Sequence, residues 1–527
     1  MTGAGSPPEA LVLSESAAAL DQEASASWGL NPFALVEAAG RSCAAAIFPL
    51  LRRGERILAC AGPGNNGADA LVMLRSLLIK DPSLRTGAAA LVSRFPGPGE
   101  QSPRSGAIRA LTAMGTPVLA WNGDDAPLRD ASLIIDGIAG TGIRGSLEGI
   151  PLEMAGALAA LEDKNRILSI DIPSGAGDRW RPGFPVVDSG CTLAVEPVKA
   201  ALYTPALRPR CGTIIPVRGI FPPSLLERYR DADLLHWETV KGTIPPVPPD
   251  AYKYHRGVTE IHAGSPGFAG AARLAAAGAS AAGAGLVRLV VDDELYPLLG
   301  ASAGGTMVIP ASRAGGGRFA CDAALLGPGW GREGRREALE AALEAEGTGI
   351  PLVLDADGIG LLSALPKGSG EPAFHHRAIL TPHVGELEAL SGIPKEQLLS
   401  EPALIQDLAR RYRGVILFKS HVMVLAGAEG RLGFVDGMNP ALGAGGTGDL
   451  LAGLCAAIAG RLRAAENRNG GSFDPRTAAA AAAALLAAAA EKRGNVFFDP
   501  LELAGTAAAL AGEAWLPAPG WRRSGGG

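Results

Sequence analysis

The sequence "GPGNNGADALVMLRSL" follows an apolar, strand-like run and carries the first group of residues whose types suit chemistry. Gly62, Gly64 and Gly67 have the G-x-G-x-x-G spacing of a dinucleotide-binding turn. A coenzyme site of that kind needs an acid at the end of the second strand, about twenty residues further on, to hold the ribose hydroxyls. The second strand ends in "ALVSRF", which contains no acid. The spacing is also typical of a plain tight turn between a strand and a helix, so both interpretations stay open.

Three polar side chains, Asn65, Asn66 and Asp69, lie where a phosphate-binding turn relies on glycine amides. Two carboxamides and a carboxylate at the end of a strand suit a sugar, an amide or a monovalent cation. The sequence therefore indicates a ligand other than a coenzyme phosphate at this turn.

Two further apolar runs end in an acid and a glycine-rich loop, in "DGIAGTGIRGSLEG" and "ILSIDIPSGAGD". The strand ends of an open α/β sheet meet at one edge, and we therefore expect Asp136, Asp171 and Ser174 to converge near Asn66. Oxygen ligands without a nearby His or Cys suit K⁺ or Mg²⁺ better than zinc. The alternative is that each Asp caps the helix after its strand.

The second half contains "NPALGAGGTGDLLAGLCAAIAG", a glycine-rich loop before a helix that we predict to begin about Gly448. The backbone N–H groups of Gly446, Thr447 and Gly448 would face an anion at the positive end of that helix. Asp449 lies at the same end, where it is suited to take a proton from a hydroxyl about to be phosphorylated. The alternative is a first-turn acid favoured only by the helix dipole. The loop is not a P-loop, because no G-x-x-x-x-G-K-[ST] occurs.

Three other strand ends accompany this loop in the second half. "VLDADG" supplies Asp355 and Asp357, "ILTPHVGE" supplies His383 and Glu386, and "VILFKSHVMV" supplies Lys419. We expect Lys419 to meet a nucleotide phosphate, and His383 to belong to the site rather than to the core.

The elements that position these residues form two α/β halves. Strand-like runs alternate with helical stretches in each half, which predicts mostly parallel, covered sheets. The proline-rich "ETVKGTIPPVPPD" between them has no helical period and is interpreted as a linker. The predicted organisation is a first domain over 1–235, a linker over 236–250 and a second domain over 251–527.

The composition of the chain limits the classes of partner that we expect it to bind. The 527 residues carry a net charge of −5 with both signs interspersed, which gives no basic stripe for nucleic acid or membrane. Six widely spaced cysteines without a C-x-x-C pair, and an N-terminus without a basic and then apolar segment, indicate a reduced, cytoplasmic protein. The alanine-rich run Ala478–Ala490 is predicted to be a packed helix rather than a membrane span.

In the first half, "GPGNNGADALVMLRSL", "DGIAGTGIRGSLEG", "IDIPSG" and "VEPVKAAL" resemble, in order, the signature blocks of the NAD(P)H-hydrate epimerase domain, with a Rossmann-like three-layer α/β/α fold. Where that family usually reads "NNGGDG", this chain has Ala68 and Ala70. The resemblance implies a potassium ion held by Asn66, Asp136 and Ser174, and a catalytic role for Asp171. It also implies that the hydrated dinucleotide contacts Asn65, Asn66, Gly67, Ala68, Asp69, Gly140, Thr141, Gly142, Ile143, Arg144, Gly145, Ser146 and Asp171.

The blocks of the second half resemble the ADP-dependent NAD(P)H-hydrate dehydratase domain, which has a ribokinase-like fold. The resemblance implies that the S hydrate contacts the region around Ala271, Gly329, His383 and Asp449, with Asp449 as the catalytic base. It implies that the adenine nucleotide, ADP or ATP with Mg²⁺, contacts Lys419, Ser420, His421, Val422, Met423, Gly446, Thr447 and Gly448. The family usually reads "LKG" with a Thr three residues on, and a Met-Ala-Thr run before "GGTGD". This chain has "KSHVM" and "LGA" at those places.

Together the two resemblances imply an enzyme that repairs the hydrates of NADH and NADPH. The first domain interconverts the R and S hydrates, and the second dehydrates the S form. We expect a homo-oligomer, without nucleic-acid or membrane partners. Two other classes stay open: a ribokinase-like small-molecule kinase fused to an accessory domain, and a non-catalytic dinucleotide-binding scaffold.

Overall fold

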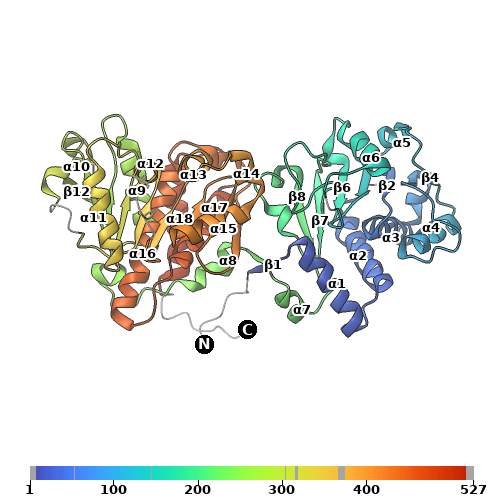
Figure 1. Ribbon diagram of the computed structural model, residues 1–527, viewed down its shortest axis with the longest axis horizontal. Helices are drawn as coiled ribbons and strands as arrows, with labels where there is room; N and C mark the ends of the chain where they lie inside the picture. Colours follow the sequence, from blue (N-terminus) through green and yellow to red (C-terminus); the bar gives the residue numbers. More distant parts are fainter. Residues whose placement is uncertain are drawn as a thin grey trace, which may run out of the picture. The chain divides into compact units, whose positions relative to one another are not determined.

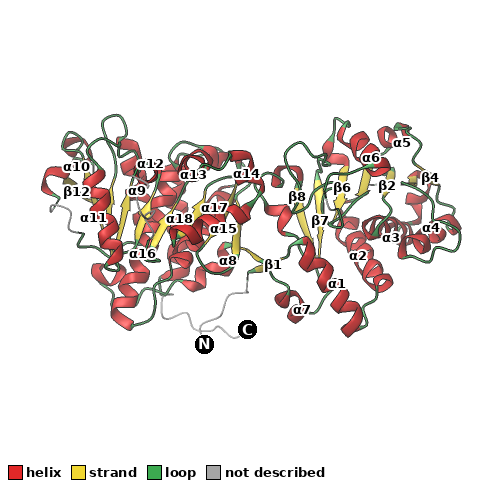
Figure 2. Cartoon of the chain, viewed as in Figure 1, coloured by secondary structure: helices red, strands yellow, loops and turns green. Residues whose placement is uncertain are grey.

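The computed structural model describes residues 8–52, 54–143, 145–302, 304–314, 319–365 and 374–517. The chain divides into two compact units, Ala10–Ala232 and Asp233–Gly527, and the second unit also includes Met1–Glu9. Each unit is built on one sheet with helices on its faces (Figures 1 and 2). The prediction of two α/β halves is therefore confirmed.

The first unit contains a seven-stranded sheet in the order β4-β3-β2-β5-β6-β7-β8, with every neighbouring pair parallel. The central strands are almost wholly buried and apolar, as expected for a parallel sheet covered on both faces. In sheet order the strands are β4 (Val118–Ala120), β3 (Ala88–Val92), β2 (Ile57–Ala61), β5 (Leu133–Gly137), β6 (Ile167–Ile170), β7 (Cys191–Val195) and β8 (Thr213–Val217).

The helices of the first unit cover this sheet. They are α1 (Ser14–Trp28), α2 (Pro32–Ile47), α3 (Asn65–Lys80), α4 (Pro103–Ala113), α5 (Ala126–Asp130), α6 (Gly149–Ala159) and α7 (Pro223–Arg228), with short 3-10 turns at Phe48–Leu50, Pro82–Gly87, Lys164–Arg166, Ala200–Tyr203 and Arg208–Arg210. Pro32–Leu50 is long and apolar enough to cross a membrane by length and composition alone. Val36, Ala39 and Cys43 of α2 are buried in the core of this unit, which identifies α2 as a core helix.

The second unit contains an eleven-stranded sheet in the order β1-β9-β18-β17-β16-β15-β14-β13-β10-β11-β12. The pairs from β16 to β12 are parallel, and β17 is antiparallel to β16 and β18. In sheet order the strands are β1 (Glu9–Leu11), β9 (Ala232–Leu234), β18 (Leu432–Asp436), β17 (Val422–Ala426), β16 (Val415–Phe418), β15 (Ala378–Leu380), β14 (Leu352–Leu354), β13 (Ala323–Leu326), β10 (Val258–His262), β11 (Leu286–Val291) and β12 (Met307–Pro310).

Alanine-rich helices form much of the core of the second unit. The helices are α8 (Trp237–Val240), α9 (Ala269–Ala281), α10 (Tyr296–Gly300), α11 (Arg336–Gly347), α12 (Ala356–Ser363), α13 (Val384–Ser391), α14 (Lys395–Ser400), α15 (Pro402–Tyr412), α16 (Thr447–Asn469), α17 (Pro475–Arg493) and α18 (Pro500–Trp515), with 3-10 turns at Lys241–Thr243, Lys253–Arg256, Ala311–Arg313 and Pro440–Gly443. The prediction that Ala478–Ala490 is a packed helix is confirmed, because this run lies in α17 and is largely buried.

Small residues let α9 and α16 approach closely. A Cβ on Gly453 would lie 2.0 Å from the backbone oxygen of Ala275, and one on Gly278 would lie 2.2 Å from that of Leu450. A larger side chain at either position would push the two helices apart. This contact fixes the start of α16, where the Gly-Gly-Thr-Gly-Asp run lies.

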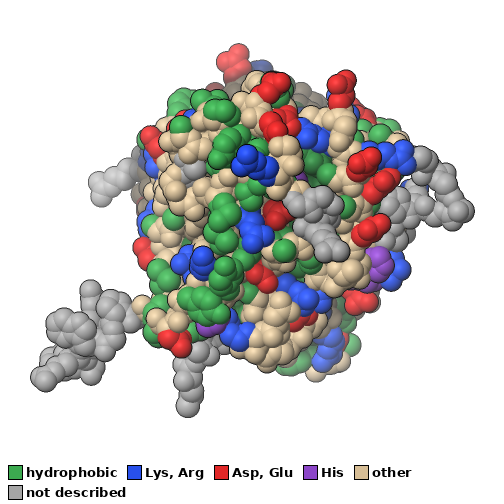
Figure 3. All heavy atoms as spheres, turned by 90° about the vertical axis from the view of Figure 1, so that its left-hand side faces the viewer, with side chains coloured by type: hydrophobic (Ala, Val, Ile, Leu, Met, Phe, Trp, Pro, Cys, Tyr) green, Lys and Arg blue, Asp and Glu red, His purple; other side chains and the backbone are tan. Residues whose placement is uncertain are grey.

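The surface carries charges of both signs. Figure 3, viewed from the side of α10, α11 and β12, shows Lys and Arg side chains interspersed with Asp and Glu. All six cysteines lie within the described residues and are free thiols.

The segment 236–250, which the sequence presents as a linker, is instead part of the second unit. The boundary between the units lies between Ala232 and Asp233. Trp237, Val240 and Ile244 are buried in the core of the second unit. The segment begins with α8 and the Lys241–Thr243 turn, and the buried apolar residues that hold it precede its prolines.

Two side chains from distant helices fasten this segment to the second unit. The Trp515 Nε1–H donates to the Lys241 backbone oxygen at 2.9 Å, and its ring meets the Trp237 ring edge-on at 5.4 Å. The Arg461 guanidinium donates to the Pro245 backbone oxygen at 3.1 Å and lies 4.4 Å from the centre of the Trp515 ring. Removal of the segment would leave these groups without their partners.

We therefore predict that a fragment 250–527 is less stable than a fragment 233–527. The shorter fragment loses three buried apolar side chains, each of which contributes about 1.5–3 kcal/mol. Thermal unfolding of the two purified fragments tests this. The longer fragment is expected to unfold cooperatively at the higher temperature, and equal melting temperatures would contradict the packing described for residues 236–250.

Candidate active sites

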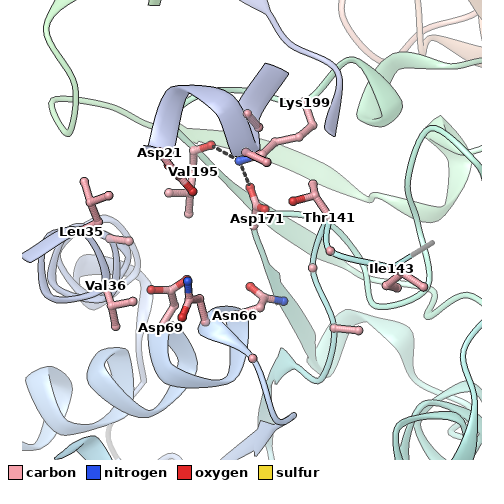
Figure 4. Close-up of a pocket in the computed structure, with 18 of the residues that line it drawn as sticks. Asp21, Leu35, Val36, Asn66, Asp69, Thr141, Ile143, Asp171, Val195 and Lys199 are labelled. Atoms are coloured by element: carbon pink, nitrogen blue, oxygen red, sulfur yellow. Dashed lines mark hydrogen bonds and ion pairs between the residues drawn. The ribbon is translucent and has the colours of Figure 1, made fainter. Parts of the chain in front are cut away.

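A pocket of about 590 Å³, with apolar and charged lining residues, lies in the first unit at the carboxyl ends of β2, β5, β6 and β7 (Figure 4). The strand order places β3 on one side of β2 and β5 on the other, so the chain reverses its direction across the sheet at this point. Ligands of open α/β sheets bind at such switch points. Parallel strands thus bring together loops that are far apart in the sequence.

The three glycines of the G-x-G-x-x-G sequence have different surroundings. A Cβ on Gly62 would lie 1.6 Å from the Ile138 backbone oxygen, and one on Gly67 would lie 2.3 Å from the backbone oxygen of Gly62. Gly64 lines the pocket and has no protein atom within 4 Å of its missing Cβ. The outer glycines are thus required for packing, and the middle one leaves room for a ligand.

Asn66 lies in the first turn of α3 and points into the pocket (Figure 4). Its side chain is 9% exposed, and neither Nδ2 nor Oδ1 has a hydrogen-bond partner among the described residues. An unpartnered buried amide costs free energy, about 1–3 kcal/mol. Such a group in a pocket indicates a bound ligand or ion that supplies the missing partner.

Asp136 ends β5 behind the pocket and is fully buried. Its Oδ1 accepts from the Ser174 hydroxyl at 2.5 Å and from the Ile138 N–H at 3.2 Å, and its Oδ2 accepts from the Ser169 hydroxyl and the Ser174 N–H. Burial raises the pKa of Asp136, although these hydrogen bonds oppose the shift. The helix-cap alternative is wrong for Asp136, because no helix starts at its loop before α6.

Asp171 follows β6 and forms a partly buried ion pair with Lys199, with 2.5 Å between Oδ1 and Nζ (Figure 4). Its backbone has φ of 69°, a left-handed conformation that is costly for a non-glycine residue and is concentrated at functional sites. Burial raises the pKa of Asp171, and Lys199 opposes that rise. The helix-cap alternative is also wrong for Asp171, because its carboxylate faces Lys199.

Two more carboxyl groups face the same pocket. Asp69 lies in α3, and burial, with a contribution from Asp171, raises its pKa well above the ordinary value. Asp21 comes from α1, and burial raises its pKa as well. The sequence did not single out Asp21 or Lys199, although Lys199 lies in the quoted "VEPVKAAL"; neither carries a local signal for its role.

The structure brings most of the residues predicted to bind the dinucleotide to this pocket. The predicted residues that line it are Asn65, Asn66, Asp69, Gly140, Thr141, Gly142, Ile143, Ser146 and Asp171. Gly67, Ala68 and Gly145 are not among its lining residues, and Arg144 lies outside the described residues. Asp136 and Ser174 lie behind the residues that line the pocket, and the Ser174 hydroxyl donates to the Asp136 carboxylate.

Ala68 and Ala70 face away from the pocket. Both side chains are fully buried in the core beneath α3. A Cβ on Gly137 would lie 2.5 Å from that of Ala70, which places the Ala70 methyl against β5. The two methyl groups therefore fill the core and leave the ligand space open.

The glycine loop of the second unit precedes α16, which begins at Thr447, one residue before the predicted start. Gly446 has φ of +96°, and a Cβ there would lie 2.2 Å from Leu274 Cδ1. The Thr447 hydroxyl donates to the backbone oxygens of Leu442 and Ala444 at 2.8 and 2.9 Å. These contacts hold the loop so that the first turn of the helix is available to an anion.

Asp449 lies in that first turn beside a buried ion pair. The Lys419 ammonium, at the end of β16, lies 2.5 Å from Oδ1 of Asp355, which also accepts from the Thr381 hydroxyl at 2.8 Å. Burial and the charge of Asp355 raise the pKa of Asp449 to about 6, while Lys419 opposes the shift. A Cβ on Gly448 would lie 3.4 Å from Lys419 Nζ, so the lysine lies against the glycine loop.

His383 follows β15 and caps α13. Its Nδ1 accepts from the N–H groups of Gly385 and Glu386, and its Nε2 lies 3.0 Å from a Glu386 carboxylate oxygen. The side chain remains 56% exposed, so one face of the imidazole is open to a ligand. A backbone bridge joins His383 to Lys419, which brings the loops after β15 and β16 together as predicted.

Ala271 and Gly329 also come together, at the switch point of the second sheet. A Cβ on Gly329 would lie 2.9 Å from that of Ala271, and the Ser265 hydroxyl donates to the Gly329 backbone oxygen at 2.9 Å. Gly329 follows β13 and Ser265 follows β10, the two strands at which the direction of winding reverses. The two residues predicted to contact the hydrate therefore share one wall.

The predicted nucleotide segment after Lys419 is a turn followed by a buried strand. Ser420 and His421 form the turn between β16 and β17. Val422 and Met423 begin β17, and their side chains are 0% and 4% exposed. We therefore expect a nucleotide here to contact the turn and the backbone rather than the side chains of Val422 and Met423.

Among the residues that the structure describes, no three His, Cys, Asp or Glu side chains are grouped so as to hold a metal ion. The candidate cation ligands of the first unit are instead one carboxylate, one amide and one hydroxyl. Such a set suits a weakly bound hard cation better than zinc.

Models of two known protein families match this chain, one in each unit. A family model described as NAD(P)H-hydrate dehydratase matches residues 260–500, and one described as YjeF-related protein N-terminus matches residues 32–201. The Bifunctional NAD(P)H-hydrate repair enzyme Nnr of Salinibacter ruber is 31% identical over 509 residues, which cover 85% of this chain and 90% of that protein. The chain belongs to this family.

Other members of the repair-enzyme family match over a similar extent. The Coxiella burnetii protein of the same name is 29% identical and covers 84% of this chain and 89% of its own length. The Escherichia coli protein is 28% identical, with 84% and 83% covered. The resemblance to the epimerase and dehydratase families is therefore confirmed.

Two solved structures are each similar to about half of this chain. A ribokinase-like superfamily protein from Enterococcus faecalis is 23% identical with a TM-score of 0.47, covering 55% of this chain and 98% of that one. An ADP/ATP-dependent NAD(P)H-hydrate dehydratase from Bacillus subtilis, co-crystallised with ATP and Mg²⁺, is 24% identical with a TM-score of 0.45, covering 53% and 99%.

The inward orientation of Ala68 and Ala70 yields a prediction. The double variant Ala68→Gly with Ala70→Gly is expected to lose about 1–2 kcal/mol of stability, because glycine inside a helix costs about 1 kcal/mol relative to alanine. Ligand binding in the pocket is expected to stay unchanged. Thermal unfolding and binding of a dinucleotide to the full chain measure the two effects. Tighter binding without loss of stability would mean that the methyl groups crowd the ligand space.

Proposed function

We propose that this chain repairs hydrated nicotinamide dinucleotides. The first unit interconverts the R and S hydrates of NADH and NADPH, and the second dehydrates the S form with ADP or ATP as the phosphoryl donor. Family membership over both units supports this, together with the pocket at the switch point of the first sheet and the charged residues after β14 to β16 in the second. The observation that carries this proposal is that one chain contains both sites. The first site has Asp171 beside Lys199, and the second has Asp449 near Lys419.

The two activities are complementary. Hydration of the nicotinamide ring destroys the hydride donor and gives a mixture of epimers. A stereospecific dehydratase repairs only one of them, and an epimerase in the same chain makes the whole mixture repairable. The dinucleotide is then the damaged substrate rather than a coenzyme, which accounts for the missing acid at the end of "ALVSRF".

In the first unit we assign Asp171 as a catalytic group and the loops around Asn66 and Gly140 as the dinucleotide contacts. Asn66, Asp136 and Ser174 fit a potassium ion, since the Asn66 amide has no partner among the described residues and Asp136 supplies a buried carboxylate. The ion would supply a positive charge that balances Asp136. Lys199 holds the Asp171 carboxylate in place and favours its ionised form.

In the second unit Asp449 takes the proton from the hydroxyl of the hydrate as phosphoryl transfer begins. The N–H groups of Gly446, Thr447 and Gly448 stabilise the charge on the transferring group at the start of α16. Lys419 and the turn that follows it hold the nucleotide, and Mg²⁺ accompanies the nucleotide phosphates. Phosphorylation makes the hydroxyl a good leaving group, which the ring-nitrogen lone pair then expels as phosphate. Loss of a proton from the adjacent ring carbon restores the ring double bond of the reduced nicotinamide.

We also propose a cytoplasmic protein that acts as a homo-oligomer on small molecules, with no nucleic-acid or membrane partner. The free cysteines and the mixed surface charge support this proposal.

The repair assay tests the proposal. Wild-type chain with mixed hydrates, ADP and Mg²⁺ is expected to restore the absorbance of the reduced nicotinamide, and Asp449→Asn is expected to lower the dehydration rate about 10²–10⁴-fold through loss of the base. Because the base acts only when ionised, the wild-type rate should rise with pH through a midpoint near 6, the raised pKa of Asp449.

The exposed Asp407 on α15 provides the matched control, because Asp407→Asn makes the same chemical change away from the site. It should retain the wild-type rate. Accumulation of a phosphorylated product in place of the reduced nucleotide would favour the kinase alternative, and an Asp449→Asn rate within about tenfold of wild type would remove Asp449 from the role of base.

The cation site gives a separate prediction. Replacement of K⁺ by tetramethylammonium is expected to slow epimerisation, because the bulky ion does not fit oxygen ligands such as those of Asn66, Asp136 and Ser174. Dehydration of the pure S hydrate should not change. Following the epimers by chromatography without ADP measures the first reaction alone, and equal slowing of both reactions would argue against a cation confined to the first unit.

A further inference from the structure

Asp69 has an environment unlike that of any other carboxyl group in the first pocket. It lies on α3 one helical turn after Asn66 and faces the cavity (Figure 4). Its Oδ1 is buried and has no hydrogen-bond partner among the described residues, and it has no ion-pair partner there either. An isolated buried carboxylate is costly, so the neutral acid is the favoured form.

Asp171 faces the same space from the other side. Figure 4 shows Asp69 on α3 and Asp171 at the end of β6, with the Asp171 carboxylate turned toward Lys199. The 2.5 Å contact with the Lys199 ammonium favours the ionised form of Asp171. Of these two carboxyl groups, Asp171 therefore has a cation partner and Asp69 has none among the described residues.

The electrostatics agree with this division. Burial raises the pKa of Asp69 well above its ordinary value, and the charge of Asp171 raises it further. Burial also raises the pKa of Asp171, but the Lys199 charge and hydrogen bond oppose that rise. The Lys199 charge also acts on Asp69, but it lowers the pKa of Asp69 less than burial and Asp171 raise it. Asp21 on α1 and the Cys43 thiol on α2 also lie near Asp69, and neither provides a positive charge. When the surroundings of two carboxyl groups separate their pKa values, the group with the higher pKa can act as the acid and the other as the base.

We propose that Asp69 is a second catalytic residue of the epimerase, acting as the acid opposite Asp171 as the base. The inference rests on the proposed function, since it concerns the carbon that carries the added hydroxyl. That carbon is bonded to the ring nitrogen, whose lone pair can expel the oxygen once the oxygen is protonated.

The steps balance without another reactant. Asp69 gives its proton to the hydroxyl oxygen, the C–O bond breaks, water leaves, and the nitrogen lone pair forms a C=N⁺ bond. Water then adds to the opposite face of the same carbon, its proton passes to Asp171, and the electron pair returns to nitrogen. The configuration is inverted, with Asp69 ionised and Asp171 protonated.

The product form of the enzyme is the reactant form for the opposite epimer. Asp171 then serves as the acid and Asp69 as the base, which restores the starting state. One pair of carboxyl groups therefore carries the reaction in both directions. Lys199 acts as a positioning residue, because it touches Asp171 and sets which of the two carboxyl groups starts ionised.

The test uses the full chain with pure R hydrate and no nucleotide, and follows the epimers by chromatography. Asp69→Asn and Asp171→Asn are each expected to slow epimerisation about 10²–10⁴-fold. Formate is expected to restore part of the rate of Asp69→Ala by replacing the missing acid. In H₂¹⁸O, each epimerisation should introduce one solvent oxygen at the hydroxyl.

The controls separate this proposal from folding and from the proposed function. Asp81→Asn makes the same change at the end of α3, outside the pocket, and should retain the wild-type rate. Dehydration of the S hydrate with ADP by Asp69→Asn should be unchanged, which shows an intact chain. Retention of the original oxygen, or an Asp69→Asn rate within about tenfold of wild type, would overturn the role of Asp69. A wild-type chain that leaves the R hydrate unchanged would overturn the proposed epimerase function itself.

Discussion

Parallel pairing of strands is the constraint on which both sites depend. Neighbouring parallel strands end at the same edge of a sheet, so residues separated by a whole helix in the sequence become neighbours in space. In the first unit this edge brings α3, the loop after β5 and the ends of β6 and β7 around one cavity. In the second unit it places Asp355, His383 and Lys419 on successive strands, opposite the start of α16. The first site lies where the strand order reverses, and in the second unit Ala271 and Gly329 lie at the corresponding point between β10 and β13.

Both sites contain partly buried carboxyl groups, and in each site a lysine pairs with one of them and not with another. Lys199 pairs with Asp171 and leaves Asp69 unpaired, while Lys419 pairs with Asp355 and leaves Asp449 with a raised pKa. The penalty for burying a charge is large, and each lysine offsets it more for the carboxyl group that it contacts than for the second one. The same physical device therefore produces an acid in one unit and a base poised near neutral pH in the other.

Close packing supports these arrangements. Gly62 and Gly67 let the turn after β2 approach the loop after β5, and Gly278 with Gly453 let α9 approach α16. Gly446 permits the left-handed turn that starts α16 beside Leu274. In the second unit, Trp515 and Arg461 fasten the chain that enters from residue 233, which makes an apparently loose proline-rich segment part of the core.

The sequence by itself determined the local features: the apolar strands such as Ala88–Val92 and Ile167–Ile170, the helix after the Gly-Gly-Thr-Gly-Asp run, the polar residues at strand ends, and the family blocks. These depend on side-chain periodicity, helix dipoles and turn chemistry within a few residues. Only the tertiary structure decided that Lys199 pairs with Asp171, that the Asn66 amide lacks a partner, that Ala68 and Ala70 face the core, and that residues 236–250 are packed. Those outcomes depend on which elements meet across the sheet, and a pairing between residues far apart leaves no local pattern in the chain.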